Sequence, residues 1–288
     1  MKKKIVSFIT LCFIVLGSLV YGAEVPAGYT YAISPPLSMT FLKNNKVLFY
    51  DLDKDEANQK TIYDYKLEYK SGVPFITIFN SKKPKTYLFL YNKNFCAFYE
   101  KDGYVYQSGI SMLNNMEGFY THDWINKDES IYATKEVMEG DIKYSAKNIV
   151  SKKIDELWAA PNNGINESII IDRLYKGYND RDERVEYEDS KHDVILMLCS
   201  GFISYNKPHL YKDNARPKKI KVTLSNTQKN ILKEYFFDLK DTPNPQVLRF
   251  KEFISDKIIT ITILDVYKGE RYSDLCISKI WSYVGRKL

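Results

Sequence analysis

The sequence predicts a mainly β protein built from antiparallel strands. Two observations carry this prediction. Tyrosine is frequent, with 24 among 288 residues, and tyrosine, isoleucine and valine favour pleated, half-buried surfaces. Short apolar or alternating runs also recur along the chain with turn residues between them, and this spacing is typical of antiparallel sheets and barrels.

The first 22 residues predict a signal peptide. Lys2, Lys3 and Lys4 form a basic start, and residues 5–20 are almost entirely apolar. This apolar run is shorter than the roughly 20 residues that a membrane-spanning helix needs. We therefore expect cleavage after Gly22 and export to the periplasm or the exterior, with no membrane span in the mature chain.

The charge of the chain argues against nucleic-acid binding. The formal net charge is +6 for all 288 residues. Residues 1–22 contain three lysines and no acid, so the mature chain keeps 39 basic against 36 acidic residues, a charge of +3. A long chain this close to neutrality lacks the basic surface that nucleic-acid binding requires.

Residues 23–140 predict an N-terminal antiparallel β domain. Its expected strands are 46–50, 65–69, 75–79, 86–91, 95–99 and 104–106. The last two are joined by Lys101-Asp102-Gly103, because Asp-Gly supplies the positive φ angles of a tight hairpin turn. The role of this domain stays open between a ligand-holding barrel, a dimerisation sheet and a spacer.

Residues 141–288 predict a second β-rich domain, with the boundary placed near Gly140. Its expected strands are 168–171, 194–199, 219–224, 235–239, 246–250, 258–264 and 276–283. Between the first two of them, residues 172–193 are charged with mixed sign, which is typical of a solvated loop.

The sequence contains no linear catalytic or metal-binding motif. It has no HExxH, no CxxC, no Gly-rich phosphate loop and no G-x-S-x-G turn. Residues 51–55 begin like a calcium-binding EF-hand loop, but Glu56 replaces the required glycine and Ile62 the bidentate glutamate. The histidines stand alone in the sequence, at His122, His192 and His209. We therefore expect no catalytic residue, no metal site and no cofactor, while a structural calcium ion held without a linear motif stays open.

The mature chain has three cysteines, Cys96, Cys199 and Cys276. Their number is odd and their spacing wide, so no disulfide pairing is determined. Cys199 and Cys276 lie in apolar, strand-like runs, and cysteine is among the most buried residue types. We expect buried free thiols.

The C-terminal half carries a series of motifs in one order. They are Leu157-Trp158, Gly164-Ile165-Asn166-Glu167, Gly201-Phe202, Asn214-Ala215-Arg216-Pro217-Lys218, Phe237 to Asp241, Gln246, and Asp265 to Asp274 followed by Ile277-Ser278-Lys279-Ile280. Over about residues 145–283 this series resembles the discoidin-like (coagulation factor 5/8 type C) domain attached to bacterial NAD glycohydrolases, which is described as a glycan-binding or translocation domain. The resemblance implies a galactose-binding-like jelly-roll β-sandwich for this half.

The chain departs from the family pattern at several positions. Ala160 and Pro161 stand where the pattern has glutamate and glycine, Asn166 replaces a glycine, and Lys279 replaces a glutamate. These changes fall partly in loops, so the ligand can differ while the fold is kept. No NAD glycohydrolase catalytic domain is recognisable in residues 23–144, and we therefore expect no enzymatic activity.

The resemblance and the residue types together predict a ligand site in loops at one end of the sandwich. Aromatic rings can stack on the flat faces of sugars, and amide, guanidinium and carboxylate groups hydrogen-bond sugar hydroxyls. The expected ligand-binding residues are Trp158, Tyr211, Asn214, Arg216, Tyr267, Tyr272 and Asp274. Some of these residues have a structural role as the alternative to ligand binding. Trp158 would be a core residue, Tyr267 would cap the sandwich, and Arg216 would form an ion pair with Asp274.

Together these features predict an exported carbohydrate-binding, lectin-like protein whose partner is a glycan or cell-surface polysaccharide. The alternative is a protein–protein docking module of an envelope or secreted complex, with an envelope protein as its partner, because one fold serves both purposes. A hydrolase with an unrecognised carboxylate pair is the third interpretation and ranks last.

Overall fold

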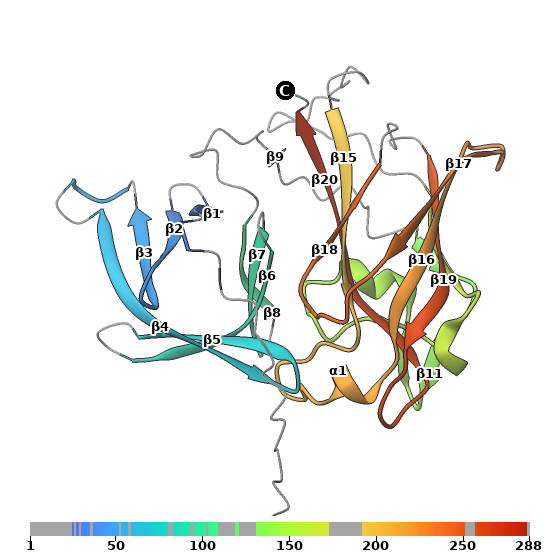
Figure 1. The fold of residues 1–288 in the computed structure, drawn as a ribbon, viewed down its shortest axis with the longest axis horizontal. Coiled ribbons are helices and arrows are strands. Elements are labelled where there is room, and N and C mark those ends of the chain that lie inside the picture. Colours follow the sequence, from blue (N-terminus) through green and yellow to red (C-terminus); the bar gives the residue numbers. More distant parts are fainter. Residues whose placement is uncertain are drawn as a thin grey trace, which may run out of the picture.

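The structure is a computed structural model, in which two β modules lie side by side (Figure 1). It describes residues 25, 27–28, 30–34, 37–51, 53–56, 59–79, 83–92, 95–101, 103–108, 119–120, 131–172, 192–250 and 257–286. The predicted signal peptide lies outside the described residues. Residues 173–191 of the predicted charged loop lie outside them too.

The N-terminal half is an eight-stranded antiparallel meander in which each strand pairs with the next. Its strands are β1 (Thr30–Ser34), β2 (Leu37–Leu42), β3 (Lys46–Asp51), β4 (Lys60–Lys70), β5 (Val73–Phe79), β6 (Lys85–Asn92), β7 (Phe95–Glu100) and β8 (Gly103–Ser108). β1 and β8 approach each other, so the sheet curls strongly, as Figure 1 shows for the blue and teal strands. All six strands expected in this region are confirmed.

Side-chain alternation gives this sheet two buried faces. In β6, Tyr87, Phe89 and Tyr91 join an aromatic-rich cluster on the concave side. Leu88 and Leu90 point to the opposite side, toward the C-terminal half. Successive residues of a strand face opposite sides of the sheet, and β6 is covered on both, which explains its nearly continuous apolar sequence.

The C-terminal half is a sandwich of two antiparallel sheets. One has the order β10-β14-β19-β16-β17, and the other has the order β13-β20-β15-β18 with β9 also paired to β20. The strands are β9 (Phe119–Tyr120), β10 (Ile131–Ala133), β13 (Trp158–Ala160), β14 (Ser168–Asp172), β15 (His192–Ser200), β16 (Arg216–Ser225), β17 (Ile231–Asp238), β18 (Gln246–Arg249), β19 (Ile258–Tyr267) and β20 (Leu275–Arg286). The sandwich also carries the hairpin β11 (Val137–Glu139) and β12 (Ile142–Tyr144), the 3-10 helices η2 (Ala146–Val150) and η3 (Asn162–Gly164), and the single-turn helix α1 (Leu210–Asp213). The mainly β class and the predicted sandwich are confirmed.

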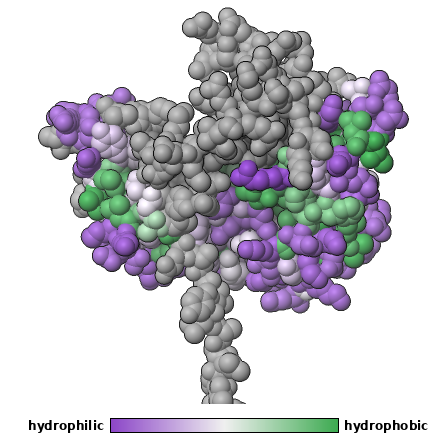
Figure 2. Space-filling view, turned by 45° about the horizontal axis from the view of Figure 1, so that its top comes forward, coloured by the Kyte–Doolittle hydropathy of each residue, from purple (hydrophilic) through white to green (hydrophobic). Residues whose placement is uncertain are grey.

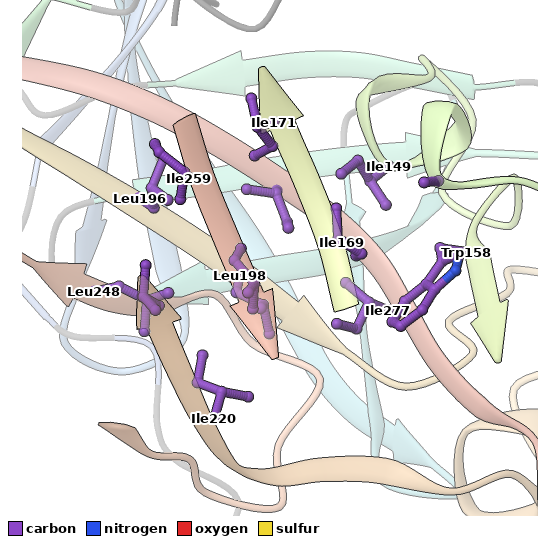
Figure 3. Packing of buried hydrophobic residues seen from close by; sticks show 14 of the residues in the cluster. Ile149, Trp158, Ile169, Ile171, Leu196, Leu198, Ile220, Leu248, Ile259 and Ile277 are labelled. Atoms are coloured by element: carbon purple, nitrogen blue, oxygen red, sulfur yellow. The ribbon is translucent and has the colours of Figure 1, made fainter. Parts of the chain in front are cut away.

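One aliphatic core fills the space between the two sheets (Figure 3). Ile169 and Ile259 from one sheet meet Leu198 and Ile277 from the other, all without exposed surface. Trp158 lies at the edge of this core, and its Nε1 donates a hydrogen bond to the carbonyl oxygen of Lys135 at 2.9 Å. Burying an aliphatic side chain of this size contributes about 1.5–3 kcal/mol, so this core is the main support of the sandwich.

The domain boundary predicted near residue 140 needs a correction. Gly140 has a φ of 57° and lies in the turn of the β11–β12 hairpin. β10, which precedes this hairpin, pairs with β14 of the sandwich, and β9 pairs with β20. The sandwich therefore begins before residue 140. The prediction was wrong because a glycine in a hairpin turn and a glycine in a linker look alike in sequence.

A second apolar cluster, here called the seam cluster, joins the two halves. It consists of Val73, Phe75, Leu88, Leu90, Phe95, Ala97 and Tyr99 from the N-terminal half, and Ile154, Met197, Cys199, Ile203, Tyr211 and Trp281 from the C-terminal half, with Tyr205 packed against it. Phe95 meets Trp281 at a ring-centroid distance of 4.8 Å. The N-terminal sheet thus covers the outer face of the sheet that contains β15 and β20, as the side-by-side strands of Figure 1 also show.

Polar contacts cross the same seam. The backbone amide of Tyr91 donates to Asn244 Oδ1 at 3.2 Å, and Asn92 Nδ2 donates to the carbonyl oxygen of Pro245 at 3.0 Å. Each satisfies a polar group that the apolar contact would otherwise strip of water. The two halves therefore form one packed unit.

The cysteines are buried in this packing. Cys96, Cys199 and Cys276 are buried free thiols in the structure, as expected from their apolar surroundings in the sequence. Burial raises the pKa of the Cys276 thiol above its usual range. Among the described residues, no helix has both the length and the apolar character to cross a membrane.

Removing the N-terminal half should prevent the sandwich from staying folded and monomeric. A chain that starts at residue 119 keeps every described strand of the sandwich but uncovers Met197, Cys199 and Trp281. Leaving a large apolar side chain exposed instead of buried costs about 1.5–3 kcal/mol, and exposed apolar patches of this kind promote aggregation. We expect aggregates in size-exclusion chromatography with light scattering, while a chain that starts at residue 23 stays monomeric. A monomeric fragment that unfolds cooperatively in urea would contradict the expectation.

Candidate functional site

The loops at one end of the sandwich lie against one another around α1. We call residues 209–216 and 268–274 the rim. The amide of Glu270 donates to the carbonyl oxygen of Lys212 at 3.0 Å, and the amides of Arg271 and Tyr272 donate to that of Asp213 at 3.1 and 2.8 Å. The rim therefore joins two segments that are far apart in sequence, as expected for a jelly-roll loop site.

Close approach at the rim requires a glycine. A Cβ atom added to Gly269 would overlap the carbonyl oxygens of Tyr272 and Asp213 and lie 2.7 Å from the carbonyl carbon of Asn214. These neighbours are backbone atoms, which cannot rotate away as a side chain could. Gly269 thus sets how closely the two segments of the rim can pack.

Arg216 terminates α1 by binding its free carbonyl groups. Its Nη1 donates to the carbonyl oxygens of Tyr211 at 3.0 Å, Lys212 at 3.2 Å and Asn214 at 2.6 Å. The last carbonyls of a helix have no partner within the helix and need one elsewhere. The carbonyl of Leu210 is satisfied by the amide and the Nδ2 of Asn214. Every carbonyl of this single helical turn is therefore paired.

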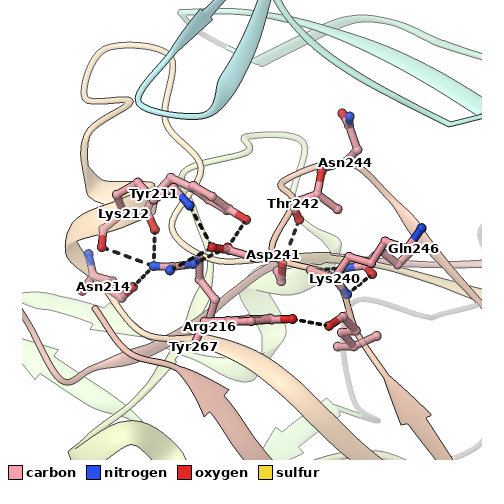
Figure 4. Close-up of polar contacts among 12 residues, drawn as sticks. Tyr211, Lys212, Asn214, Arg216, Lys240, Asp241, Thr242, Asn244, Gln246 and Tyr267 are labelled. Carbon is pink, nitrogen blue, oxygen red and sulfur yellow. Dashed lines mark hydrogen bonds and ion pairs between the residues drawn. The ribbon is translucent and has the colours of Figure 1, made fainter. Parts of the chain in front are cut away.

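Asp241 holds Arg216 and two further side chains in place (Figure 4). Its carboxylate accepts hydrogen bonds from Arg216 Nε at 2.7 Å and Arg216 Nη2 at 3.3 Å, from Lys212 Nζ at 2.8 Å, and from the Tyr211 hydroxyl at 3.0 Å. Burial opposes the charge on Asp241, but the hydrogen bonds and positive charges of Arg216 and Lys212 outweigh burial and lower its pKa. Burial, followed by the Asp241 charge, raises the pKa of Tyr211 well above its usual range.

The loop that carries Asp241 is itself fixed by neighbouring groups. The Tyr267 hydroxyl donates to the carbonyl oxygen of Leu239 at 2.9 Å. Gln246 binds both the amide and the carbonyl of Lys240, at 2.7 and 3.0 Å. With both sides of the loop held, the carboxylate of Asp241 has a defined position.

Two of the predicted aromatic platforms lie inside the protein. Trp158 is fully buried in the sandwich core, and Tyr211 is 1% exposed in the seam cluster. A ring covered on both faces has no surface for a sugar, so the expectation of stacking is corrected for both residues. For Trp158 the alternative prediction of a core residue is the correct one.

Three further predicted residues support the loops. Asn214 and Arg216 are 6% and 4% exposed, and their side chains bind the helix carbonyls described above. The alternative prediction of an ion pair between Arg216 and Asp274 is wrong. Arg216 does form an ion pair, but its partner is Asp241. Tyr267 is half-buried and uses its hydroxyl on Leu239.

Tyr272 and Asp274 are the predicted residues whose side chains reach the outside of the rim. Tyr272 is 49% exposed as a residue, and Asp274 is half-buried. Burial, and then the negative charge of Glu139 on the β11–β12 hairpin, raise the pKa of Asp274. The amide of Asn163 donates to the carbonyl oxygen of Ser273 at 2.5 Å, which ties η3 to the same segment. The solvent-facing part of the rim is thus bordered by η3 and by the hairpin.

Sequence reasoning missed Asp241 and Glu139. Asp241 ends the motif Phe237–Asp241 that carried the family resemblance, so an acid near the buried Arg216 could have been sought there. Glu139 lies beside the predicted boundary glycine and has no neighbouring motif in the sequence. Among the described residues, no group of three or more His, Cys, Asp or Glu side chains is arranged to hold a metal ion.

Comparison with known proteins gives one family match and several similar solved structures. Residues 120–283 match the family described as NAD glycohydrolase translocation F5/8 type C domain. A fucose binding module of Streptococcus pneumoniae is similar at 11% identity and a TM-score of 0.35, over 58% of this chain and 96% of that chain. The family 32 carbohydrate-binding module of NanJ from Clostridium perfringens, in complex with galactose, is similar at 16% identity and a TM-score of 0.36, over 59% of this chain and 99% of that chain. No curated protein matches the sequence.

The family match begins at β9 and ends within β20, which are the first and last strands of the sandwich. It therefore contains the whole rim and the corrected domain start. Because the matched segment is more than half of the 288 residues, the chain belongs to the NAD glycohydrolase translocation F5/8 type C domain family.

Proposed function

We propose that the protein is exported and binds a glycan on the rim of its C-terminal sandwich, without catalysing a reaction. Membership of the F5/8 type C family supports this, since the resemblance of the motifs implies a carbohydrate-binding role. The observation that carries the proposal is the exposed ring of Tyr272, which stands on a backbone segment held by α1. The basic leader with its apolar run supports export.

The rim offers the chemistry that a sugar needs. An aromatic ring provides a flat apolar surface for the C–H face of a sugar. Asp274 stands two residues further along the same segment, and a carboxylate accepts strong hydrogen bonds from hydroxyl groups. Arg271 lies next to Tyr272, its side chain is 67% exposed, and its Nη1 forms an ion pair with Asp213 Oδ2 at 3.9 Å that leaves its other N–H groups free of this acid. It is therefore available as a donor.

The rim is also prepared for binding before a ligand arrives. The amides of Arg271 and Tyr272 and the carbonyl of Asp274 are hydrogen-bonded within the protein, the last to the amide of Ala215 at 2.9 Å. A segment already held in place loses little conformational freedom when ligand binds, and this increases affinity. Mobile loops would lack this advantage.

A protein partner is the second candidate, and one observation favours it. Met138 and Ile142 on the β11–β12 hairpin are 70% and 58% exposed. Figure 2 shows that apolar (green) surface also occurs elsewhere on the visible face of the C-terminal half, among hydrophilic (purple) residues. The hairpin register pairs Met138 with Lys143 and Ile142 with Glu139, so the two apolar side chains face opposite sides of the hairpin. An apolar side chain exposed in this way can be an anchor of a protein interface. A stoichiometric protein partner that is lost in a Met138→Ser variant would favour this function over glycan binding.

Tyr272→Ala should weaken glycan binding by about tenfold, which corresponds to about 1.4 kcal/mol, because it removes the stacking surface. The measurement is isothermal titration of the mature chain with the best glycan from an array. Tyr132→Ala is the matched control, since Tyr132 is 48% exposed against 49% for Tyr272 but lies on β10. Equal affinities for the two variants, or no array signal for the parent chain, would rule out the proposed site. Release of reducing sugar from a bound polysaccharide would show a hydrolase instead.

Asp241→Asn should reduce the free energy of unfolding at about pH 7 by about 3 kcal/mol, because it leaves the buried guanidinium of Arg216 without its counter-charge. Asp265→Asn is the control: Asp265 contacts Lys218 at 2.7 Å, the same distance as Asp241 to Arg216, but both side chains are about half exposed. We expect a change below about 1 kcal/mol there. Urea unfolding measures both.

The effect of Asp241→Asn should depend on pH in a defined direction. The pKa of Asp241 is lowered in the folded protein, so its stabilisation is complete above the usual aspartate pKa of about 3.9 and is lost as the pH falls through the lowered value. Unfolding curves recorded toward pH 2 should therefore converge for the parent and the variant. A difference that persists at the lowest pH would show that the charge is not the cause.

A further inference from the structure

We infer that the N-terminal sheet is a positioning element of the rim, which holds α1 and the segment before it so that Tyr272 and Asp274 are presented to ligand. The inference rests on the proposed function, because presentation matters only where ligand binds. The contacts that support it lie within the chain and involve Gly72 and Phe75 of the N-terminal half.

The first contact is made by the turn between β4 and β5. Lys70 pairs with Val73, which leaves Ser71 and Gly72 as a two-residue turn with φ angles of 50° and 84°. Such turns with two positive φ angles join tightly twisted strands. A Cβ atom at Gly72 would lie 3.4 Å from Lys212 Cε and 3.7 Å from Tyr211 Cδ1. The turn therefore rests directly on α1.

The second contact is made by the segment that leads into α1. The Tyr205 ring packs edge-on against Phe75 of β5 at a centroid distance of 5.6 Å. Its hydroxyl donates to the carbonyl oxygen of Thr86 in β6 at 3.2 Å. The amide of Leu210, the first residue of α1, donates to the carbonyl oxygen of Lys207 at 3.1 Å, so this segment and the helix are continuous. The N-terminal sheet thus touches both the approach to α1 and the helix itself.

These contacts matter because α1 has only four residues. Isolated helices much shorter than about 12 residues are not stable in water, so the position of α1 depends on what surrounds it. On one side it is bound by Arg216 and by the amides of residues 270–272. On the other side lie Gly72 and the Tyr205 segment. A shift of α1 would carry the carbonyl of Asp213, and with it the backbone of Tyr272.

The test compares two matched substitutions in the full chain, Phe75→Ala and Phe95→Ala. Both phenylalanines belong to the seam cluster and are 2% and 1% exposed. Phe75 packs on Tyr205 beside α1, whereas Phe95 packs on Trp281 in β20. Hydrogen–deuterium exchange is measured at the amides that bind the carbonyls of α1, those of Asn214, Glu270, Arg271 and Tyr272. Exchange in the β16–β19 ladder serves as the internal reference.

Phe75→Ala should accelerate exchange of these amides by about tenfold relative to the reference, as expected for local opening, and Phe95→Ala should leave their relative rates unchanged. Equal acceleration in both variants, or none in Phe75→Ala, overturns the inference. Should either alanine variant fail to fold, Phe75→Leu and Phe95→Leu keep more of the packing and allow the same comparison.

A glycan array separates this inference from the proposed function. A weaker array signal for Phe75→Leu than for Phe95→Leu supports positioning, and equal signals count against it. An array that is silent for the parent chain removes glycan binding as the function, whereas the exchange rates still decide whether the N-terminal sheet holds the rim.

Discussion

The rim depends on the burial of one guanidinium group. Arg216 is 4% exposed, and a buried charge without a partner is strongly destabilising. Asp241 therefore has to lie beside it, and the remaining protons need acceptors, which the carbonyl groups of α1 supply. The Arg216 side chain thus finds a counter-charge in Asp241 and at the same time supplies hydrogen-bond donors to the carbonyl groups at the end of α1. The loop of Asp241, the single turn α1 and the start of β16 consequently share one geometry.

The seam between the halves strengthens that arrangement. The pair Arg216–Asp241 and the exposed pair Lys218–Asp265 have the same 2.7 Å separation. Charges interact more strongly where the surroundings are dry and poorly polarisable than where water screens them. Tyr211 connects the dry seam cluster to the carboxylate of Asp241 through its hydroxyl. The N-terminal sheet, by covering the ring of Tyr211, therefore also affects the electrostatics of the rim.

Strands β3 to β8 and β14 to β20 could be predicted because alternation and apolar runs in the sequence record which side of a sheet is covered, whereas β1, β2 and the short strands β9 to β13 were not predicted. The start of the sandwich could not be predicted, because a glycine such as Gly140 occurs both in hairpin turns and in linkers between domains. The site was predicted less well than the fold. Residue type identifies Trp158 and Tyr211 as aromatic but not as covered, and the cover of Tyr211 comes partly from Gly72, far away in sequence. The pairing of Arg216 with Asp241 is likewise a contact between distant segments that no local motif contains.

The residues that the fold needs and the residues that remain for a ligand are different ones. Asn214 and Arg216 carried the family resemblance, yet their side chains are engaged by the carbonyls of α1 and by Asp241. At Arg271 and Tyr272 the hydrogen bonds to α1 come from the backbone amides, and both residues are largely exposed, with the Arg271 side chain in a 3.9 Å ion pair with Asp213. Substitutions there change what a ligand meets while the hydrogen bonds of α1 stay intact. If the rim binds ligand as proposed, the outer side chains of residues 268–274 can differ without any change in the scaffold, so the motifs identify the fold better than the ligand.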